Sequence, residues 1–429
     1  MVNKLRAYMN GHLVGDLVRV PSGALRFEYA NEWKNSAIAR PISLSIPLRV
    51  PLGDSEQVRV FFQNLLPDSP RILEHIQKRL GIASSHPFDI LAVIGGDCVG
   101  ALQLLPEGVP PGSGWPEADP LTDEEVERIL SNTAKFPLGM EKDGNFRISL
   151  AGAQEKTALL KLKGCWMRPR GATPTSHILK LPIGVLSQNS LDLSTSCENE
   201  WLCLRIAEAY GFDCAKAEIS QFGSCKALAV ERFDRKMLPD GRILRLPTED
   251  LCQALGVSPE LKYESEGGPG VADVLGLLRY SAEPSDSMTF FKAQVLFWIL
   301  GATDGHAKNF SIFLDADGYR LTPLYDILTI WPLVATRGIE LNKAKLAMAI
   351  AGNNRHYKIT EIRKRHFLAM ASANGLRADE VKREIEAMAE ATPSVTAQVS
   401  AELPPGFPES VSGPVFETMR KQAQKLLAD

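Results

Sequence analysis

The chain has 429 residues, which is too long for one ordinary hydrophobic core and predicts two or three domains. Hydrophobic residues make up 45% and charged residues 23%, the proportions of a globular protein. The net charge of −3 argues against a nucleic-acid footprint over a whole domain, and the apolar runs are too short for a membrane span. Seven scattered cysteines without a C-x-x-C pair, and no signal-peptide pattern, predict reduced thiols in a cytoplasm.

The first part of the chain, residues 1–107, alternates short apolar runs with Gly, Pro and Asn, as in "LRAYMNGHLVGDLVRV". This pattern predicts small antiparallel strands. "EQVRVFFQNLLPDSPRILEHIQKRLG" has helical spacing with a proline break, and "DILAVIGGDCVGALQLLP" predicts a helix and then a strand. The Pro- and Gly-rich "EGVPPGSGWPEADPLTDEEV" is the strongest linker candidate, and "LTDEEVERIL" restarts a helix with acidic residues in its first turn.

Residues 108–245 contain a second β-rich segment, with strands predicted in "FRISLAGAQEKTALLKL", "SHILKLP" and "CKALAVERFDRK". Between them, "CENEWLCLRIAEAYG" predicts an amphipathic helix closed by Gly211. Residues 246–429 are predominantly helical, and apolar side chains recur there at steps of three and four residues. A β-rich part followed by a helical part predicts a two-lobed α+β fold, and ligands bind in clefts between such lobes.

The polar segment "TDGHAKN" separates two apolar runs near residue 304. Within it, Asp304 and Asn309 have the D-x-x-x-x-N spacing of a protein-kinase catalytic loop, where Asp accepts the substrate hydroxyl proton and Asn holds a metal ion. The same residues also suit a purely local structure, with Asp304 capping a turn and Asn309 in a left-handed backbone. A metal hydrolase built on Asp304 and His306 is disfavoured, because no second histidine lies at ligand spacing.

Residues 309–326 are predicted to form a hairpin, because "NFSIFL" and "YRLTPLYD" flank the turn-forming quartet "DADG". With a four-residue loop at 315–318, Asn309 faces Leu324, and Asp326 lies one pair further along, close to Asn309. A carboxylate and an amide oxygen brought together suit a hard cation such as Mg²⁺. The alternative is that Asp326 caps the next helix.

A kinase also needs a lysine on a strand of the first lobe and a glutamate on the following helix. "SHILKLP" supplies Lys180, whose charge is costly in an apolar strand unless it is paired. "CENEW" supplies Glu200 as the partner, with Glu198 as the alternative. Taken singly, the lysine suits a strand edge in water and the glutamates suit a helix N-terminus. The chain order Lys, Glu, Asp, Asn, Asp favours the kinase.

Two further segments suit a nucleotide. "SLAGAQEKTALL" puts small residues at 151–153, where backbone N–H groups can approach phosphate oxygens, but it is no G-x-G-x-x-G. "ALAVERFDR" predicts the strand into an interlobe hinge, where the backbone of Glu231, Arg232 and Phe233 can bind adenine. These three residues equally suit a strand that runs to the surface.

Seven stretches together resemble the HipA family: "ISLAGAQEKTALL", "HILKLPIG", "ALAVERFDR", "LRLPTEDLCQALG", "KYESEGGPG", "LGATDGHAKNFS" and "RLTPLYDI". The resemblance extends from "FFQNLLPDSPR" to the C-terminal helices. HipA proteins are serine/threonine-kinase toxins of bacterial HipBA toxin–antitoxin modules. The resemblance implies a kinase-like fold with a small β-rich subdomain (1–107), a β-rich N-lobe (108–245) and an all-helical C-lobe (246–429), distantly related to protein and lipid kinases.

The resemblance implies ATP and Mg²⁺ as cofactors, Asp304 as catalytic base, and Asn309 and Asp326 as metal ligands. The implied ATP-binding residues are Ala151, Gly152, Ala153, Gln154, Glu155, Lys156, Lys180, Glu231, Arg232, Phe233, His306, Ala307, Lys308, Asn309, Tyr325 and Asp326. Ser149 is the implied autophosphorylation site, although without the resemblance it reads as a strand serine facing water. One departure is that "YDI" replaces the usual D-F-G.

The family's activity implies a substrate among the aminoacyl-tRNA synthetases, glutamyl-tRNA synthetase in particular, with arrest of translation and growth and drug-tolerant persistence as the result. It also implies a dimeric helix-turn-helix antitoxin, HipB, with which the chain acts as a co-repressor on operator DNA, associated with the nucleoid. In "LAMASANGLRADE", which corresponds to the family's DNA-contacting segment, cations are few, and Arg377 is the remaining candidate contact.

Two other functions compete with this hypothesis. One is a DNA-bound regulatory subunit whose kinase machinery is incidental, which the presence of Lys180, Asp304, Asn309 and Asp326 together argues against. The other is a small-molecule or lipid kinase of the same distant superfamily. The sequence contains no short docking motif that would name the substrate.

Overall fold

The computed structural model describes residues 3–50, 53, 55–82, 84–132, 156–186 and 191–428. The chain divides into two compact units. The first consists of Met1–Leu181, Ser220–Glu260 and Ser311–Gly318, and the second of Pro182–Ile219, Leu261–Phe310 and Tyr319–Asp429. The domain boundaries predicted after residues 107 and 245 both fall inside the first unit and stay predictions. In the described part of the chain, no helix has the length and apolar character to cross a membrane.

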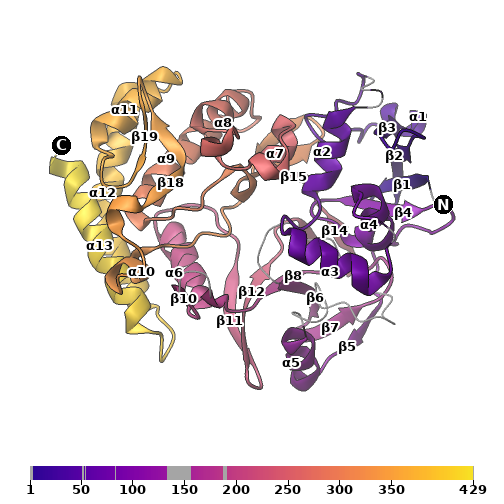
Figure 1. The fold of residues 1–429 in the computed structure, drawn as a ribbon, viewed down its shortest axis with the longest axis horizontal. Coiled ribbons are helices and arrows are strands. Elements are labelled where there is room, and N and C mark those ends of the chain that lie inside the picture. The colour runs from indigo at the N-terminus through magenta and orange to yellow at the C-terminus, as the bar shows by residue number, and fades with distance from the viewer. Residues whose placement is uncertain are drawn as a thin grey trace. The chain divides into compact units, whose positions relative to one another are not determined.

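The first unit begins with a four-stranded antiparallel sheet of order β3-β2-β1-β4. Its strands are β1 (Lys4–Met9), β2 (His12–Arg19), β3 (Leu25–Tyr29) and β4 (Leu102–Pro106). The chain between β3 and β4 forms α1 (Asn31–Lys34), α2 (Glu56–Asn64), α3 (Pro70–Leu80), α4 (Pro87–Ile94) and the 3₁₀ turn η1 (Gly95–Asp97). Alternate residues of β1 are buried, and α2 and α4 pack against this sheet, as the alternating apolar pattern predicted (Figure 1).

A six-stranded sheet of order β11-β12-β8-β6-β7-β5 follows. Its strands are β5 (Ala118–Pro120), β6 (Lys156–Leu162), β7 (Cys165–Pro169), β8 (His177–Lys180), β11 (Ala217–Phe222) and β12 (Cys225–Glu231). The predicted helix restart is α5 (Asp123–Ser131), which begins with a capping box between Thr122 and Glu125 and packs against β12.

The rest of the first unit is made of short elements. They are β13 (Arg235–Met237), β14 (Ile243–Arg245), β15 (Thr248–Asp250), α7 (Leu251–Leu255), η3 (Pro259–Leu261) and β16 (Ser311–Asp315). β13 pairs with β14 and β15 pairs with β16, both antiparallel. The strand β17 (Gly318–Leu321) follows β16 across the boundary to the second unit.

The second unit is mostly helical, as predicted. Its helices are α6 (Ser196–Ala209), α8 (Val271–Leu278), α9 (Asp286–Leu300), α10 (Trp331–Ala335), α11 (Lys364–Ala373), α12 (Ala378–Ala401) and α13 (Glu409–Ala428). The long helices α12 and α13 pack against each other; α12 also contacts α6, and both contact α9 (Figure 1). The short elements are β9 (Gly184–Leu186), β10 (Leu191–Leu193), η4 (Glu264–Glu266), η5 (Ala307–Asn309) and η6 (Leu341–Lys343).

One hairpin departs from the all-helical C-lobe that the sequence predicted. β18 (Lys345–Ala351) pairs with β19 (Arg355–Lys358) in an antiparallel ladder. The β18 sequence "KLAMAIA" consists largely of good helix formers, so its local propensity favours the wrong structure. The strand is nevertheless buried over five consecutive residues and packs against α8, α9 and α11. Tertiary burial has overridden propensity here.

Candidate active site

The polar segment at 303–309 begins where α9 ends. Gly301 closes α9 in a left-handed backbone, and a Cβ there would lie 2.6 Å from the Trp331 ring, so glycine is required. The backbone carbonyl of Asp304 then accepts two hydrogen bonds, from the His306 N–H and from the Asn309 Nδ2, each at 2.8 Å. These bonds fix the loop into one conformation, with Asn309 in η5.

The carboxylate of Asp304 is exposed, and a hydrogen bond restrains its orientation. Its Oδ1 accepts a hydrogen bond of 2.7 Å from the Tyr263 hydroxyl. The buried His306 ring packs edge-on against the Tyr263 ring, with centroids 4.9 Å apart. An exposed, oriented carboxylate is suited to accept a proton from an incoming hydroxyl group. The segment from Asp304 to Asn309 therefore forms one hydrogen-bonded loop, and its catalytic role stays a prediction.

Tyr325 connects the segment after the hairpin to this loop. Its hydroxyl donates a 2.9 Å hydrogen bond to the backbone carbonyl of Lys308. Asp326 follows in a left-handed backbone with φ of 56°. Such a conformation costs a non-glycine residue about 1–3 kcal/mol and is concentrated at functional sites. Further along, the Asn199 side chain of α6 exchanges two 2.8 Å hydrogen bonds with the Thr329 backbone.

The predicted hairpin forms, but its pairing ends earlier than predicted. β16 ends at Asp315 and β17 begins at Gly318, so the turn is shorter than the predicted loop at 315–318. β17 ends at Leu321, and Leu324 bonds instead to the backbone of Asp213 and Ala215, at 2.8 Å each. Pro323 explains the early end, because proline has no N–H to give to a ladder.

The side-chain oxygens of Asn309 and Asp326 are of the chemical type that binds a magnesium ion together with phosphate, and the sharing of one ion by the two residues stays a prediction. The Asn309 Nδ2 is used by the Asp304 carbonyl, which directs the amide oxygen away from that contact. Mg²⁺ prefers oxygen ligands and is usually held by one or two carboxylates plus waters and substrate phosphates. In the ranges that the structure describes, no cluster of three or more His, Cys, Asp or Glu forms an all-protein cage. An amide and a carboxylate agree with a shared metal.

The predicted lysine lies in the first unit. Lys180 ends β8, with its backbone paired to Lys156 of β6 and Leu228 of β12, and its residue is only 6% exposed. Lys156 begins β6 and is half-buried. Ser149 and the rest of the predicted phosphate loop, residues 151–155, lie outside the described residues.

The two candidate glutamates lie in the second unit. Glu198 and Glu200 are in the first half of α6, and both are buried. Since Lys180 belongs to the first unit, its predicted pairing with Glu200 or Glu198 stays a prediction. Arg377, the predicted DNA contact, is exposed at the start of α12, next to Asp379 and Glu380 in the first helical turn.

The predicted hinge segment has a different character at each residue. Glu231 is exposed at the end of β12, and Phe233 is half-buried with its ring edge-on to Phe313 at 5.9 Å. Arg232 is buried, and its guanidinium donates to both oxygens of Asp234 at 2.9 and 2.8 Å. It also donates to Asp97, Thr175 and the Cys98 carbonyl.

These bonds use all five N–H groups of Arg232. The predicted role of Arg232 at a nucleotide is thereby limited to its backbone, where it stays a prediction.

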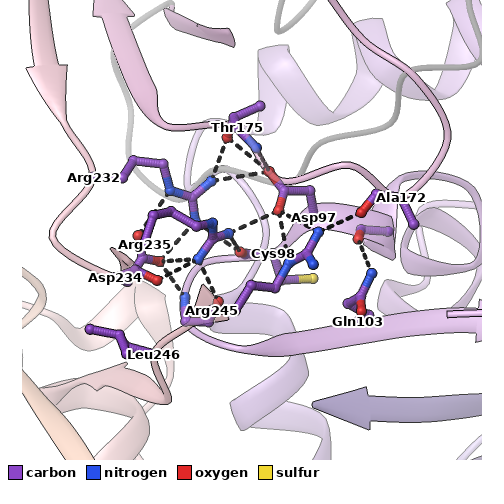
Figure 2. A network of polar contacts seen from close by, with 12 residues as sticks. Asp97, Cys98, Gln103, Ala172, Thr175, Arg232, Asp234, Arg235, Arg245 and Leu246 are labelled. Atoms are coloured by element: carbon purple, nitrogen blue, oxygen red, sulfur yellow. Dashed lines mark hydrogen bonds and ion pairs between the residues drawn. The ribbon is translucent and has the colours of Figure 1, made fainter. Parts of the chain in front are cut away.

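Arg232 belongs to a buried arginine–aspartate network, shown in Figure 2, that also contains Asp97, Asp234, Arg235 and Arg245. Asp97 Oδ1 accepts from Arg235 at 2.9 Å and from Arg245 at 3.2 Å, and its Oδ2 accepts from Arg232 at 3.2 Å. Burial alone would raise the pKa of the Asp97 carboxyl, but the three guanidinium groups hold it well below its usual range. Asp97 is thus a fixed anion.

The network joins η1 and the residues after it to β13 and β14. The Gly100 N–H donates to Asp234 Oδ2 at 2.7 Å, and Arg235 donates to the Gly100 carbonyl at 2.8 Å. Gly100 has φ of 73°, and a Cβ there would lie 2.4 Å from the Thr248 carbonyl oxygen. No other residue type fits this approach of two chain segments.

Sequence reasoning missed two of these features. Tyr263 was quoted only as part of "KYESEGGPG", and its contact with Asp304 spans 41 residues of chain. Asp97 was not singled out at all, and it reaches Arg232 across 135 residues. The charge density of "ERFDRK" at the end of an apolar strand was the available signal for the network.

An α+β fold whose D-x-x-x-x-N loop presents an oriented aspartate defines a kinase-like enzyme. The comparisons with known proteins assign the family. A model of the HipA-like C-terminal domain matches residues 148–396, and a model of the HipA N-terminal domain matches residues 5–105. The chain belongs to the HipA family and is a kinase.

Individual relatives agree over nearly the whole length. The chain is 35% identical to Y4mE of Sinorhizobium fredii, a protein named as a kinase, over 93% of this chain and 92% of that protein. It is 30% identical to the serine/threonine-protein kinase toxin HipA of Shewanella oneidensis, over 94% of this chain and 90% of that protein. The solved complex of Shewanella oneidensis HipA, HipB and operator DNA matches with a TM-score of 0.82 and 26% identity, covering 99% of this chain and 97% of that one.

Proposed function

We propose that the chain transfers the γ-phosphoryl group of ATP to a serine or threonine hydroxyl of a protein, and that Asp304 is the catalytic base. The observation that carries this proposal is the exposed Asp304 carboxylate, whose backbone carbonyl is fixed by two donors and whose Oδ1 is held by Tyr263. Such positioning is the main contribution that a protein makes to phosphoryl transfer.

In the proposed reaction, the acceptor oxygen forms a bond to the γ-phosphorus while the bond from that phosphorus to the ADP oxygen breaks. Asp304 takes the proton of the acceptor hydroxyl. Lys180 and residues 151–156 bind phosphate oxygens, and Glu231 to Phe233 contact adenine through their backbone. Asn309 and Asp326 would hold a magnesium ion, which would neutralise charge on the phosphates.

We infer an aminoacyl-tRNA synthetase, glutamyl-tRNA synthetase first, as the substrate, because the chain belongs to a family of kinase toxins. Transfer to this target stops translation and arrests growth. The test is to incubate the purified chain with γ-labelled ATP, Mg²⁺ and a bacterial lysate, with and without added glutamyl-tRNA synthetase. Label in one synthetase band is expected, and Asp304→Asn is the matched control. Label confined to small molecules or lipid would instead support the small-molecule kinase.

We propose Ser149 as the site at which the chain phosphorylates itself and so becomes inactive. Its position directly before residues 151–156 supports this, because a charged phosphoserine would disturb the loop that binds phosphate. Ser149→Ala should remove the labelled peptide that contains residue 149 and prolong growth arrest. A phosphopeptide map with the label on another residue would refute the assignment.

We further propose that a HipB-like helix-turn-helix dimer binds and neutralises the chain, and that the two together repress transcription from operator DNA in the bacterial cytoplasm. The match to a HipA–HipB–operator complex supports this partner set. Co-expression of the antitoxin should restore growth, and the complex should shift operator DNA in an electrophoretic assay. Asp304→Asn should keep repression while losing phosphorylation, and a loss of both would contradict separate regulatory and kinase roles.

A further inference from the structure

The loop from residue 261 to residue 270, which contains "KYESEGGPG", folds back on itself in the second unit. Its centre is Glu264, a buried residue whose carboxylate accepts a hydrogen bond from the Ala349 N–H of β18 and lies 3.5 Å from Arg355. A Cβ on Gly268 would lie 1.8 Å from the Leu261 carbonyl oxygen, and one on Gly270 would lie 2.6 Å from the Glu264 carboxyl carbon. Both glycines are therefore required by close packing.

This anchored loop contacts the polar segment at 303–309, the proposed catalytic segment, at three points. The Lys262 carbonyl accepts a 3.4 Å hydrogen bond from the Ala307 N–H. The Tyr263 ring packs edge-on against His306, and the Tyr263 hydroxyl donates to Asp304 Oδ1 at 2.7 Å. Because the loop is held by β18 on its other side, the tyrosine cannot move freely with Asp304.

A phenol is a suitable group to orient a carboxylate base without competing with it. It donates one hydrogen bond, and its ordinary pKa near 10 keeps its proton in place at neutral pH. A hydrogen bond to a carboxylate is among the stronger ones, and it reduces the rotation of the side chain. With Oδ1 bound to Tyr263, Oδ2 is the oxygen left to accept the proton of the substrate hydroxyl.

We propose that Tyr263 is a positioning residue for phosphoryl transfer, which orients Asp304 so that Oδ2 faces the acceptor hydroxyl; this rests on the proposed role of Asp304 as base. Tyr263 itself touches no reacting atom. The inference adds to the kinase site a residue on a separate loop, whose geometry depends on Glu264, Gly268 and Gly270.

The test compares Tyr263→Phe with Tyr280→Phe. The first variant keeps the ring that packs on His306 and removes only the hydroxyl, and the second removes a hydroxyl from a tyrosine of the same unit that is 76% exposed. The rate of labelled phosphate transfer from ATP to the protein fraction of a bacterial lysate is measured with each full-length variant. We expect kcat to fall about ten- to hundredfold in Tyr263→Phe. The KM for ATP, the thermal unfolding midpoint and the rate of Tyr280→Phe should stay unchanged.

A double variant separates positioning from a general structural role. If Tyr263 acts through Asp304, then Tyr263→Phe added to Asp304→Asn should cause no further loss of rate, because residues that act as a unit are not additive. A multiplicative loss, or a lower midpoint in Tyr263→Phe, would overturn the inference. So would an unchanged or increased kcat, the latter indicating that the tyrosine blocks the base.

The same variants distinguish this inference from the proposed function. An Asp304→Asn chain that retains full activity overturns the base assignment and the inference together. An inactive Asp304→Asn chain with a fully active Tyr263→Phe chain overturns the inference alone.

Discussion

The proposed catalytic segment at 303–309 and the arginine–aspartate network use similar polar side chains for different purposes. In the network, every carboxylate is buried and surrounded by guanidinium groups, so its charge is neutralised inside the first unit. In the proposed catalytic segment, the His306 N–H, the Asn309 side-chain amide and the Tyr263 hydroxyl hold the exposed Asp304, and among the described residues no cationic side chain pairs with its carboxylate. A charge satisfied on all sides stabilises a structure, whereas a charge held from one side remains available for chemistry.

The catalytic side of this comparison gives the largest expected effect. Asp304→Asn removes the proposed base but keeps the backbone contacts of the loop. The rate of phosphoryl transfer should fall roughly 10²- to 10⁴-fold, the usual value of general base catalysis. Urea unfolding should give the same free energy as the wild type, because the side chain lies at the surface. A loss of stability without a loss of rate would reverse the assignment of roles.

The network should respond in the opposite way. Asp97→Ala leaves three buried arginines with one carboxylate, and removing one partner of a buried ion pair costs about 3–5 kcal/mol of unfolding free energy. Asp119→Ala breaks an ion pair with Arg170 at the surface of the same unit and should cost only about 0–1 kcal/mol. Denaturant unfolding of the two variants measures this difference. Equal effects would contradict the view that burial makes the network structural.

Glu249 is a buried carboxyl group of the first unit that lies outside the network, and it shows what burial does to a carboxyl group there. It is fully buried on β15, and its Oε1 accepts a 2.9 Å hydrogen bond from the Leu44 N–H. Burial raises its pKa from 4.5 to about 8. The native state therefore keeps a proton that the unfolded chain has lost, and stability falls as the pH rises between these two values.

The slope of this dependence is about 1.4 kcal/mol per pH unit for one such group. Glu249→Gln imitates the protonated form, so this part of the loss of stability with rising pH should be absent. The unfolding free energy of the variant should therefore rise relative to that of the wild type as the pH rises. Unfolding free energies measured across this window test the prediction, with the exposed Glu32→Gln as control. A constant difference at all pH values would show that Glu249 does not titrate on unfolding.

The smallest effect concerns the backbone of Asp326. Because asparagine tolerates a left-handed backbone and alanine does not, Asp326→Ala should unfold with about 1–2 kcal/mol less free energy than Asp326→Asn. Both variants should lose phosphoryl transfer, since neither supplies the carboxylate proposed to hold Mg²⁺. Equal stabilities would mean that the backbone relaxes when the carboxylate is absent.

What the sequence predicted well was local. The D-x-x-x-x-N spacing between apolar runs identified a loop that the structure forms with Asn309 bonded back to Asp304. Alternation and capping residues likewise predicted the N-terminal sheet and α5. These features depend on residues within a few positions of one another, where propensity and hydrogen bonding act together.

What it could not predict was long-range or depended on burial. Tyr263 and Asp97 take their roles from partners far along the chain, and a local pattern assigned Arg232 to a hinge without revealing that its guanidinium was already fully bonded. The hairpin was predicted too long, because its pairing was extended past Pro323. β18 was missed because its residues favour a helix until neighbouring elements bury both faces.

The network restricts how the two segments of this protein can be lost or exchanged in evolution. Asp97 comes from the segment that matches the HipA N-terminal domain, whereas Arg232, Arg235 and Arg245 come from the segment that matches the C-terminal domain. A chain without the first segment would keep the three arginines with a single remaining aspartate. We expect such a chain to fold poorly and to be degraded by proteases. We therefore expect an exchange of one segment between homologues to succeed only where the anion and its three cations are retained.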